Sequence, residues 1–306
     1  MSLLTSLKRK GPSGFGSGST AEDVTEGLDL SGRTILVTGS NSGIGHETVR
    51  VLAKRGARVI ATARTEEKAR AAVAVLGKEM VPLACELSSP SSVRGCIAAV
   101  QALGQPLDAI ICNAGIMALP KLEQAFGYEL QFFTNHIGHF LLVTGLLDQL
   151  AEHARVVMVA SEAHRRAPEA GIAFDNLSGK NGYNHWEAYG QSKTANILFA
   201  KQLAKRLAGT KKTANAIHPG VIHTNLVRNM PAIASAGMAV LAPLLFKSVA
   251  QGAATQCFVA TRPELAGVSG QYFVDCNLAQ PRSYARDAAR AERLWQETER
   301  IVSQLP

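Results

Sequence analysis

The chain has 306 residues, of which 46% are hydrophobic and 18% are charged. This balance is typical of a globular domain and excludes a disordered chain. With no run of about twenty uninterrupted apolar residues, it also excludes a bundle of membrane-spanning helices. Lysine and arginine outnumber the acidic residues by 32 to 24, a net charge of +8. These basic residues are dispersed among acidic ones, so no nucleic-acid partner is expected.

The five cysteines are widely separated and form no C-x-x-C pair, so neither a disulfide framework nor a zinc site is predicted. Near the N-terminus, Lys8, Arg9 and Lys10 lead into Gly11 and Pro12 rather than into the apolar core of a secretory signal. We therefore expect a soluble protein of a reducing compartment, the cytoplasm.

The chain divides into two parts. Residues 1–27 are rich in Gly, Ser and Lys and lack apolar periodicity, which predicts a flexible arm, with one domain over 28–306. In that domain short apolar runs alternate with helix-length segments. The predicted strands are 34–38, 58–62, 80–84, 109–112, 155–159, 213–217 and 271–274, and the predicted helices are 49–55, 66–76, 92–103, 122–150 and 187–207. This alternation predicts a single doubly wound α/β domain with a parallel sheet of about seven strands and helices on both faces.

A glycine-rich segment, T-G-S-N-S-G-I-G, spans residues 38–45 between the first predicted strand and a helical pattern. Glycines at 39, 43 and 45 permit a tight turn and close approach of the backbone to a pyrophosphate. The helix that follows offers free amide groups and the positive end of its dipole. This context predicts a dinucleotide site. The candidate contacts are Gly39, Ser40, Asn41, Ser42, Gly43, Ile44 and Gly45.

The end of the second predicted strand indicates which dinucleotide binds. A site for NAD usually has Asp or Glu there, whereas this chain has A-T-A-R-T over 61–65, with Arg64 in place of an acid. A guanidinium group binds a 2′-phosphate through two charge-assisted hydrogen bonds, although a solvated arginine is the alternative. The sequence therefore favours NADP(H) over NAD(H).

Tyr189 and Lys193 lie four residues apart at the start of a long helical pattern, so their side chains share one face. An isolated tyrosine has a pKa of about 10, and a nearby ammonium group favours the phenolate. The pair follows a predicted strand that ends at V-A-S-E, which includes Ser161. The spacing predicts an acid/base pair, with Lys193 lowering the pKa of Tyr189.

Several motifs occur together and in order. They are T-G-x-x-x-G-I-G at 38–45, C-N-A-G at 112–115, Asn135, Ser161, Y-x-x-x-K at 189–193 and H-P-G at 218–220. With them the chain from about 30 to 300 resembles the short-chain dehydrogenase/reductase superfamily, whose members have a Rossmann domain. Segments 133–140 and 189–196 are similar to retinol-dehydrogenase-like reductases and WW-domain-containing oxidoreductases. The arm is especially similar to that of plant dehydrogenases associated with the chloroplast inner-envelope translocon.

The resemblance implies a role for each matching residue. Tyr189 would be the general acid/base, Lys193 would hold the ribose and lower the tyrosine pKa, Ser161 would hydrogen bond the substrate oxygen, and Asn135 would hold a relay water. The further cofactor contacts that it implies are Glu86, Leu87, Asn113, Ala114, Gly115, Pro219, Gly220, Val221 and Thr224, beside Tyr189 and Lys193 themselves.

The chain departs from the family pattern at two places. Family members often have Asp where this chain has Glu86, whose side chain is longer by one methylene group. Ser161 and Tyr189 are separated by an insert over 165–186, which retinol-dehydrogenase-like members share. Trp186, in that insert, is expected either to cap a substrate or to close the insert over the core.

Three histidines suggest other chemistry, which we do not favour. His136 and His139 have a spacing that one metal ion could bridge, but no carboxylate or cysteine lies at a convincing distance, and no metal site is predicted. His164 follows Ser161 by three residues, but no G-x-S-x-G elbow surrounds that serine, so a hydrolase is not favoured.

The segment over about 222–250 has no charged residue between Arg228 and Lys247. In the family this segment is the substrate lid, and an apolar lid implies a hydrophobic carbonyl or alcohol as the partner. Peripheral membrane contact and an oligomer interface are the alternatives. An amphipathic C-terminal helix is expected at about 282–302, either covering a sheet edge or packing on a partner, so that monomer and homo-oligomer both stay open.

These observations predict an NADP(H)-dependent oxidoreductase that interconverts a carbonyl and an alcohol on a hydrophobic substrate. The alternative is an NADP(H)-binding redox-sensing or regulatory interaction protein with little turnover. The complete Asn, Ser, Tyr and Lys set favours the enzyme.

Overall fold

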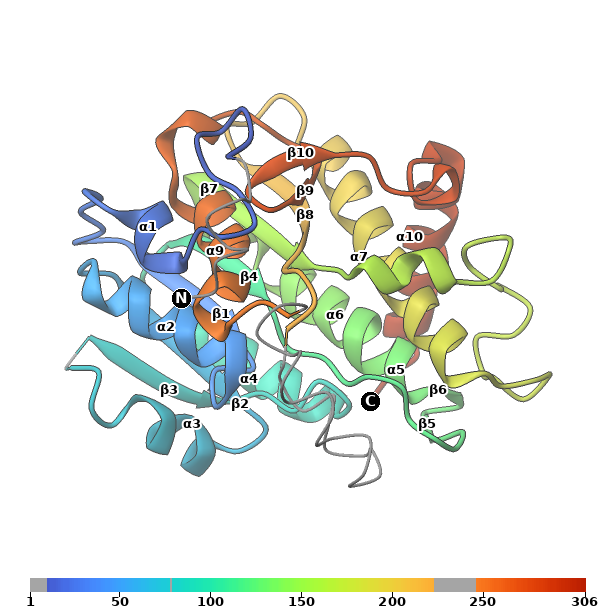
Figure 1. Cartoon of the computed structure of the whole chain (residues 1–306). Helices are drawn as coiled ribbons and strands as arrows, with labels where there is room; N and C mark the ends of the chain where they lie inside the picture. The colour runs from blue at the N-terminus through green and yellow to red at the C-terminus, as the bar shows by residue number, and fades with distance from the viewer. Residues whose placement is uncertain (1–9, 78, 223–245) are drawn as a thin grey trace, which may run out of the picture.

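The protein is seen in a computed structural model that describes residues 10–77, 79–222 and 246–306. Its centre is an eight-stranded sheet with the order β10–β9–β8–β7–β4–β1–β2–β3 (Figure 1). The strands are β1 (Thr34–Thr38), β2 (Arg58–Ala63), β3 (Met80–Ala84), β4 (Leu107–Cys112), β7 (Leu150–Val159), β8 (Thr213–His218), β9 (Tyr272–Val274) and β10 (Asn277–Ala279). The predicted α/β fold is confirmed, and all seven expected strands pair in parallel.

The eighth strand, β10, was not predicted. It pairs with β9 in the antiparallel sense, through a two-residue turn at Asp275 and Cys276. Both turn residues have positive φ, +52° and +64°. Such turns normally have Gly at the second position, so Cys276 after Asp275 gave little indication of a hairpin.

Helices cover both faces of the sheet. One layer contains α2 (Gly43–Lys54), α3 (Glu66–Val73) and α9 (Val249–Thr261), and the other contains α4 (Pro90–Ala102), α6 (Gly138–Gly145) and α7 (His185–Arg206). All five residues of β1 are buried, as expected for a parallel strand that is covered on both sides. The result is a two-sided core in which the carboxyl ends of the strands are held in fixed positions.

The C-terminal helix α10 (Ala288–Ser303) packs on the outside of α7, so the predicted helix over 282–302 is present after one 3₁₀ turn, Ser283–Ala285. Its apolar face buries Trp295 against the rings of Phe199 and Phe140, with centroid distances of 5.5 and 4.8 Å. In the structure this helix packs on α7 of its own chain.

The expected flexible arm over 1–27 is wrong for residues 10–27. Helix α1 (Ala21–Thr25) buries Ala21 and Val24 completely and begins with a capping box between Thr20 and Asp23. Phe15 packs against Phe258 of α9 at 5.7 Å. A few apolar residues thus dock a segment whose overall Gly and Ser content predicts flexibility. Residues 1–9 lie outside the described part of the chain.

The single helix expected over 122–150 is also wrong. A short hairpin, β5 (Gln124–Ala125) and β6 (Tyr128–Glu129), turns at Phe126 and Gly127, which both have positive φ. The chain then continues through α5 (Leu130–Phe132), a π-helical turn (Phe133–Ile137), α6 and a 3₁₀ turn, and β7 starts at Leu150. A π turn often marks a functional site, and this one contains Asn135.

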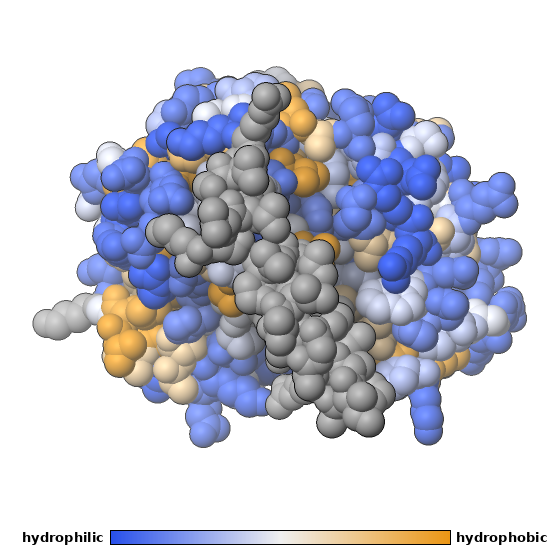
Figure 2. Space-filling model, viewed as in Figure 1, coloured by the Kyte–Doolittle hydropathy of each residue, from blue (hydrophilic) through white to orange (hydrophobic). Residues whose placement is uncertain are grey.

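On the face that Figure 2 shows, the described residues are mostly hydrophilic, with apolar areas between them. The most exposed large apolar side chain among the described residues is Val75, which follows α3 and is 90% exposed. None of the helices in the described ranges is long and apolar enough to cross a membrane. Most of the lid expected over 222–250 lies outside these ranges. At its ends, Ile222 pairs with Lys247 in a parallel bridge, and α9 begins at Val249.

Candidate active site

A cavity of about 400 Å³ lies at the carboxyl ends of β1, β2, β3 and β4, a volume within the range of ligand pockets. In the strand order, β1 lies between β4 and β2, so the chain leaves β1 toward one side of the sheet and later returns to the other. Ligands of open α/β sheets bind at such a reversal. The lining residues are Gly39, Asn41, Ser42, Gly43, Ile44, Gly45, Ala63, Arg64, Lys68, Cys85, Glu86, Leu87, Asn113, Ala114, Gly115, Ile116 and Thr134.

The glycine-rich loop is compact because two of its residues have no side chain. A Cβ at Gly39, where φ is +70°, would lie 2.9 Å from the Cα of Ala114, and a Cβ at Gly45 would collide with the carbonyl oxygen of Gly39. Within the described ranges, the side chain of the N-cap residue Ser42 makes no hydrogen bond to the first turn of α2. The amide groups of that turn are therefore available to an anion.

Residues after β4 hold this loop in place. The Asn113 amide donates to the Thr38 carbonyl at 2.9 Å, and the Ala114 N–H donates to the Thr38 hydroxyl at 3.0 Å. The same hydroxyl is 2.9 Å from Nε2 of the fully buried His139. Burial lowers the pKa of His139 to about 4, so its ring is neutral at pH 7.

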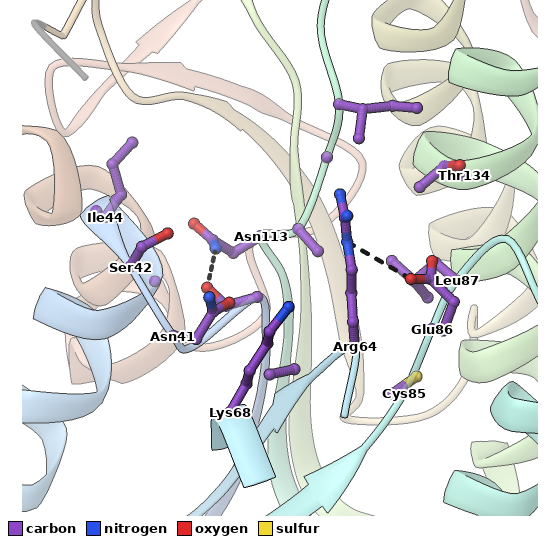
Figure 3. A pocket seen from close by; sticks show the side chains of 17 residues that line it. Asn41, Ser42, Ile44, Arg64, Lys68, Cys85, Glu86, Leu87, Asn113 and Thr134 are labelled. Carbon is purple, nitrogen blue, oxygen red and sulfur yellow. Dashed lines mark hydrogen bonds and ion pairs between the residues drawn. The ribbon is translucent and has the colours of Figure 1, made fainter. Parts of the chain in front are cut away.

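The far end of the cavity contains three charged side chains. Arg64, at the end of β2, points across the cavity toward Glu86, with Nε 3.5 Å from Oε2, and Lys68 lies beside it (Figure 3). The Arg64 side chain is 66% exposed. Glu86 also accepts from the Ser88 amide at 3.2 Å and from its hydroxyl at 2.9 Å. This arrangement presents two cations, one of them paired with a carboxylate.

Asn135 is buried behind the cavity and joins two segments. Its Oδ1 accepts from the Ile116 N–H at 2.8 Å, and its Nδ2 donates to the Ile116 carbonyl and to the Ser192 hydroxyl, both at 2.9 Å. A Cβ on Gly115 would lie 3.1 Å from Asn135 Oδ1 and 3.4 Å from Lys193 Nζ, so only a glycine leaves these groups undisturbed. Both N–H groups of the Asn135 amide thus bind protein atoms.

Ser161, Tyr189 and Lys193 lie together beyond the end of β7. Ser161 hydrogen bonds the Tyr189 phenol. Lys193 is 3% exposed, donates to the Val159 carbonyl at 3.0 Å and has Nζ 5.6 Å from the centre of the Tyr189 ring. The four residues of the predicted catalytic set therefore form one contiguous group, with Asn135 linked to α7 through Ser192.

The pKa values in this group differ from the expectation. Burial raises the pKa of Tyr189 to about 12, and the hydrogen bond from Ser161 opposes this rise. Burial also lowers the pKa of Lys193 to about 8. The protein groups alone therefore do not produce the low tyrosine pKa that the Y-x-x-x-K spacing predicts. A phenol with this pKa is a proton donor at neutral pH.

The other candidate residues fall into three groups. Ser40 is fully buried under the loop, with its hydroxyl donating to the Val37 carbonyl at 2.9 Å. Pro219, Gly220 and Val221 follow β8, and Gly220 has a φ of +94° where a Cβ would meet the Lys247 side chain. Thr224 lies outside the described ranges.

The sequence analysis missed Lys68, one helical turn after Arg64, and the lining residues Ala63, Cys85, Ile116 and Thr134.

Thr134 gives a further indication of a ligand. It is 7% exposed and lines the cavity, yet its hydroxyl has no hydrogen-bond partner among the described residues. A buried polar group without a partner costs free energy unless a ligand or water satisfies it. Together with the uncapped turn of α2 and the close approach at Gly39, this hydroxyl fits a dinucleotide.

The sheet reversal and glycine-rich turn define a nucleotide-binding α/β protein. The family model for short chain dehydrogenases matches residues 33–175 and 172–233, and the chain belongs to this family. The chain is 43% identical to short-chain dehydrogenase TIC 32 B, chloroplastic, from Brassica napus, over 97% of each chain. It is 36% identical to human retinol dehydrogenase 14 over 90% of this chain and 88% of the relative. It is also 36% identical to human WW domain-containing oxidoreductase, over 95% and 73%.

Solved structures have the same fold. An uncharacterized protein from Mycobacterium Paratuberculosis has a TM-score of 0.76 and 31% identity over 92% of this chain and 97% of its own. A short chain dehydrogenase from Burkholderia cenocepacia J2315, in complex with NADP, has a TM-score of 0.64 and 27% identity over 80% and 96%. The predicted membership of this superfamily and of its retinol-dehydrogenase-like subgroup is confirmed.

Proposed function

We propose that the protein is an NADP(H)-dependent oxidoreductase that interconverts a carbonyl and an alcohol on a hydrophobic substrate, with Tyr189 as general acid/base. The observation that carries this proposal is the buried ammonium group of Lys193, whose Nζ lies 5.6 Å from the centre of the Tyr189 ring, with Ser161 beside the phenol. A bound nicotinamide supplies the hydride, and the protein supplies orientation and the proton.

Each side chain has a defined task in carbonyl reduction. The Ser161 hydroxyl donates to the substrate oxygen, where negative charge develops, and the Tyr189 phenol delivers a proton to that oxygen. A tyrosine pKa of about 12 keeps this proton in place at neutral pH. Lys193 keeps its positive charge below about pH 8, and this charge stabilises the phenolate that remains once the proton has left Tyr189. Reduction is therefore expected to slow as the pH rises above 8.

The preference for NADP(H) is supported by the charges at the far end of the cavity. Arg64 and Lys68 both line it, and a 2′-phosphate binds a guanidinium group through two hydrogen bonds. Glu86 lies at the third strand rather than the second, so it does not take the place of the acid that binds the ribose in NAD sites. A relative of this fold has been solved in complex with NADP.

The apolar substrate is supported by the uncharged sequence between Arg228 and Lys247 and by the relatives that are named retinol dehydrogenases. The test is NADPH oxidation across a panel of aliphatic, aromatic, steroid and retinoid carbonyls. The Tyr189→Phe variant should bind NADPH normally and lose roughly a hundredfold or more of kcat, since the general acid is gone. Near-normal turnover in this variant would remove Tyr189 from its role.

The alternative is an NADP(H)-binding redox-sensing or regulatory interaction protein with little turnover. It predicts tight NADPH binding without oxidation by any carbonyl of the panel. Turnover that disappears in Tyr189→Phe would contradict it.

A further inference from the structure

The peptide group that joins Ser161 to Glu162 lies between two histidine rings. The carbonyl of Ser161 is 2.7 Å from Nδ1 of His164 and also accepts from the backbone N–H of His164 at 3.0 Å. On the other side of the same peptide group, the Glu162 N–H donates to Nδ1 of His218 at 3.2 Å. Both polar atoms of this peptide group are therefore bound by an imidazole.

The partners of His164 fix its tautomer. Its Nε2 accepts from the Arg282 N–H at 3.3 Å, because a backbone amide can only donate, so the proton is on Nδ1 and points at Ser161. The ring is fully buried and lies edge-on against Tyr272 at 5.6 Å. The His164 carbonyl accepts from the Tyr284 hydroxyl at 2.7 Å. His164 thus connects Ser161 to the segment that precedes α10.

His218, the last residue of β8, has the opposite tautomer. Its Nδ1 accepts from an amide, so it has no proton there. Burial lowers the pKa of His218 to about 4 and moves the pKa of His164 down as well. The charged groups facing His164 are Glu162, Arg165 and Arg282, and those facing His218 are Glu162, Lys247 and Asp275, beside His164 itself. Both rings are neutral at pH 7, as their hydrogen bonds require.

The turn that follows Ser161 is also held against the catalytic helix. A Cβ on Gly190 would lie 2.6 Å from the Ala163 carbonyl and 2.6 Å from the Ala167 nitrogen, so α7 approaches this turn as closely as backbone atoms allow. Gly190 is the neighbour of Tyr189. The Ser161 hydroxyl itself accepts from the Ala163 N–H at 3.1 Å.

We propose that His164 and His218 are positioning residues, which together clamp the Ser161–Glu162 peptide group and so hold the Ser161 hydroxyl on the Tyr189 phenol. This inference rests on the proposed reductase function. The ring nitrogens of both histidines that have a partner bind backbone atoms. Their effect is on geometry, and a displacement of about 1 Å in a reacting group reduces rates by roughly a hundredfold.

Asparagine and glutamine separate this role from a general structural one. Asn places its amide at the distance of Nδ1 and provides either the donor to the Ser161 carbonyl or the acceptor for the Glu162 amide. Gln places its amide at the distance of Nε2 and loses that contact. We expect His164→Asn and His218→Asn to retain kcat within about threefold, and the two Gln variants to lose roughly 10- to 100-fold in kcat. NADPH affinity and KM should change by less than about threefold in all four variants.

A double-mutant cycle tests whether the effect passes through Ser161. The Ser161→Ala variant alone should lose about 10²- to 10³-fold in kcat, since one donor to the substrate oxygen is removed. In this background, His164→Gln or His218→Gln should reduce kcat by less than about threefold more, because the group that they position is absent. The proposal would be overturned if the kcat loss of each double variant equalled the product of the two single-variant losses. Equal kcat values for the Asn and Gln variants would also overturn it.

Two further variants serve as controls for this experiment. His136 is equally buried, and its Nε2 is 2.9 Å from the Thr298 hydroxyl of α10, a contact that Gln preserves. His136→Gln should leave kcat unchanged. If a Gln variant of the clamp does not fold, Tyr284→Phe removes the hydroxyl that binds the His164 carbonyl, and its milder loss in kcat should vanish in the Ser161→Ala background. A wild-type chain that reduces no carbonyl would overturn the proposed function, whereas an active wild type with additive losses would overturn the clamp alone.

Discussion

The two ends of the cofactor cleft are built by different means. At the end beside α7, Asn135, Ser192 and Lys193 are at most 3% exposed, and each hydrogen bonds to backbone or to one another. At the end beside β2, Arg64 is 66% exposed and its ion pair with Glu86 spans 3.5 Å. Buried groups with several partners have one geometry, whereas exposed charged side chains adjust to a ligand. We infer that reaction geometry is fixed before binding and that cofactor choice depends on side chains that move.

The largest expected effect of this difference is acid lability of the buried end. Burial lowers the pKa of His136 to about 3 and the pKa values of His139 and His218 to about 4, against 6.5 in an unfolded chain. As the pH falls, these histidines are therefore protonated in the unfolded state before they are protonated in the folded state. The free energy of unfolding has its full value above pH 6.5 and decreases as the pH falls toward 4, by about 1.4 kcal/mol per histidine per pH unit.

At pH 5 this linkage amounts to roughly 2 kcal/mol for each of the three residues, or about 6 kcal/mol in all. Denaturant unfolding at pH 7 and pH 5 measures the difference. The slope of unfolding free energy against pH gives the number of protons taken up on unfolding, and His136→Gln should lower that number by about one. An uptake of less than one proton by the wild type would contradict the neutral state of these rings.

The next effect concerns Asn135. Asn135→Ala leaves the Ile116 N–H and carbonyl without a partner, so we expect a loss of about 3 kcal/mol in unfolding free energy and roughly 100-fold in kcat. Asn215 is a matched control, because its amide also bridges a backbone carbonyl, that of Val268, and a backbone N–H, that of Gln271. Asn215→Ala should lose similar stability and keep kcat. Equal kcat losses would mean that the rate follows stability alone.

Sequence patterns identified the residues of the buried end, but they did not predict all of the contacts between them. The glycine-rich loop and the Tyr189–Lys193 spacing depend on local backbone rules, and the structure places them as those rules require. The helix expected over 122–150 failed because apolar residues that are buried on all sides, as in α6, show no period that separates a helix from a hairpin and a π turn. The contact of His218 with the Ser161–Glu162 peptide group joins chain segments more than fifty residues apart, which no local pattern encodes.

The exposed end should respond to substitution by a change in cofactor choice. Arg64→Ala should weaken NADPH binding by roughly 10- to 50-fold and NADH binding by less than about twofold, since only the 2′-phosphate contacts the guanidinium group. Arg58 lies at the opposite end of the same strand and pairs with Gln105 at 3.0 Å, so Arg58→Ala makes the same change in charge away from the cavity. Fluorescence titration of both cofactors measures these effects. Equal losses for NADPH and NADH would refute the assignment of Arg64.

The smallest effect, and the only gain, is expected for Glu86→Gln. The carboxylate holds Arg64 at 3.5 Å and would repel a 2′-phosphate placed between Arg64 and Lys68. Removing its charge should therefore tighten NADPH binding by about two- to fivefold, a change of less than about 1 kcal/mol as expected for exposed charges. The gain should shrink in high salt, because screening weakens the repulsion. NADH, which lacks the phosphate, should gain nothing. Weaker NADPH binding would instead mean that Glu86 contributes an acceptor that the bound adenine needs.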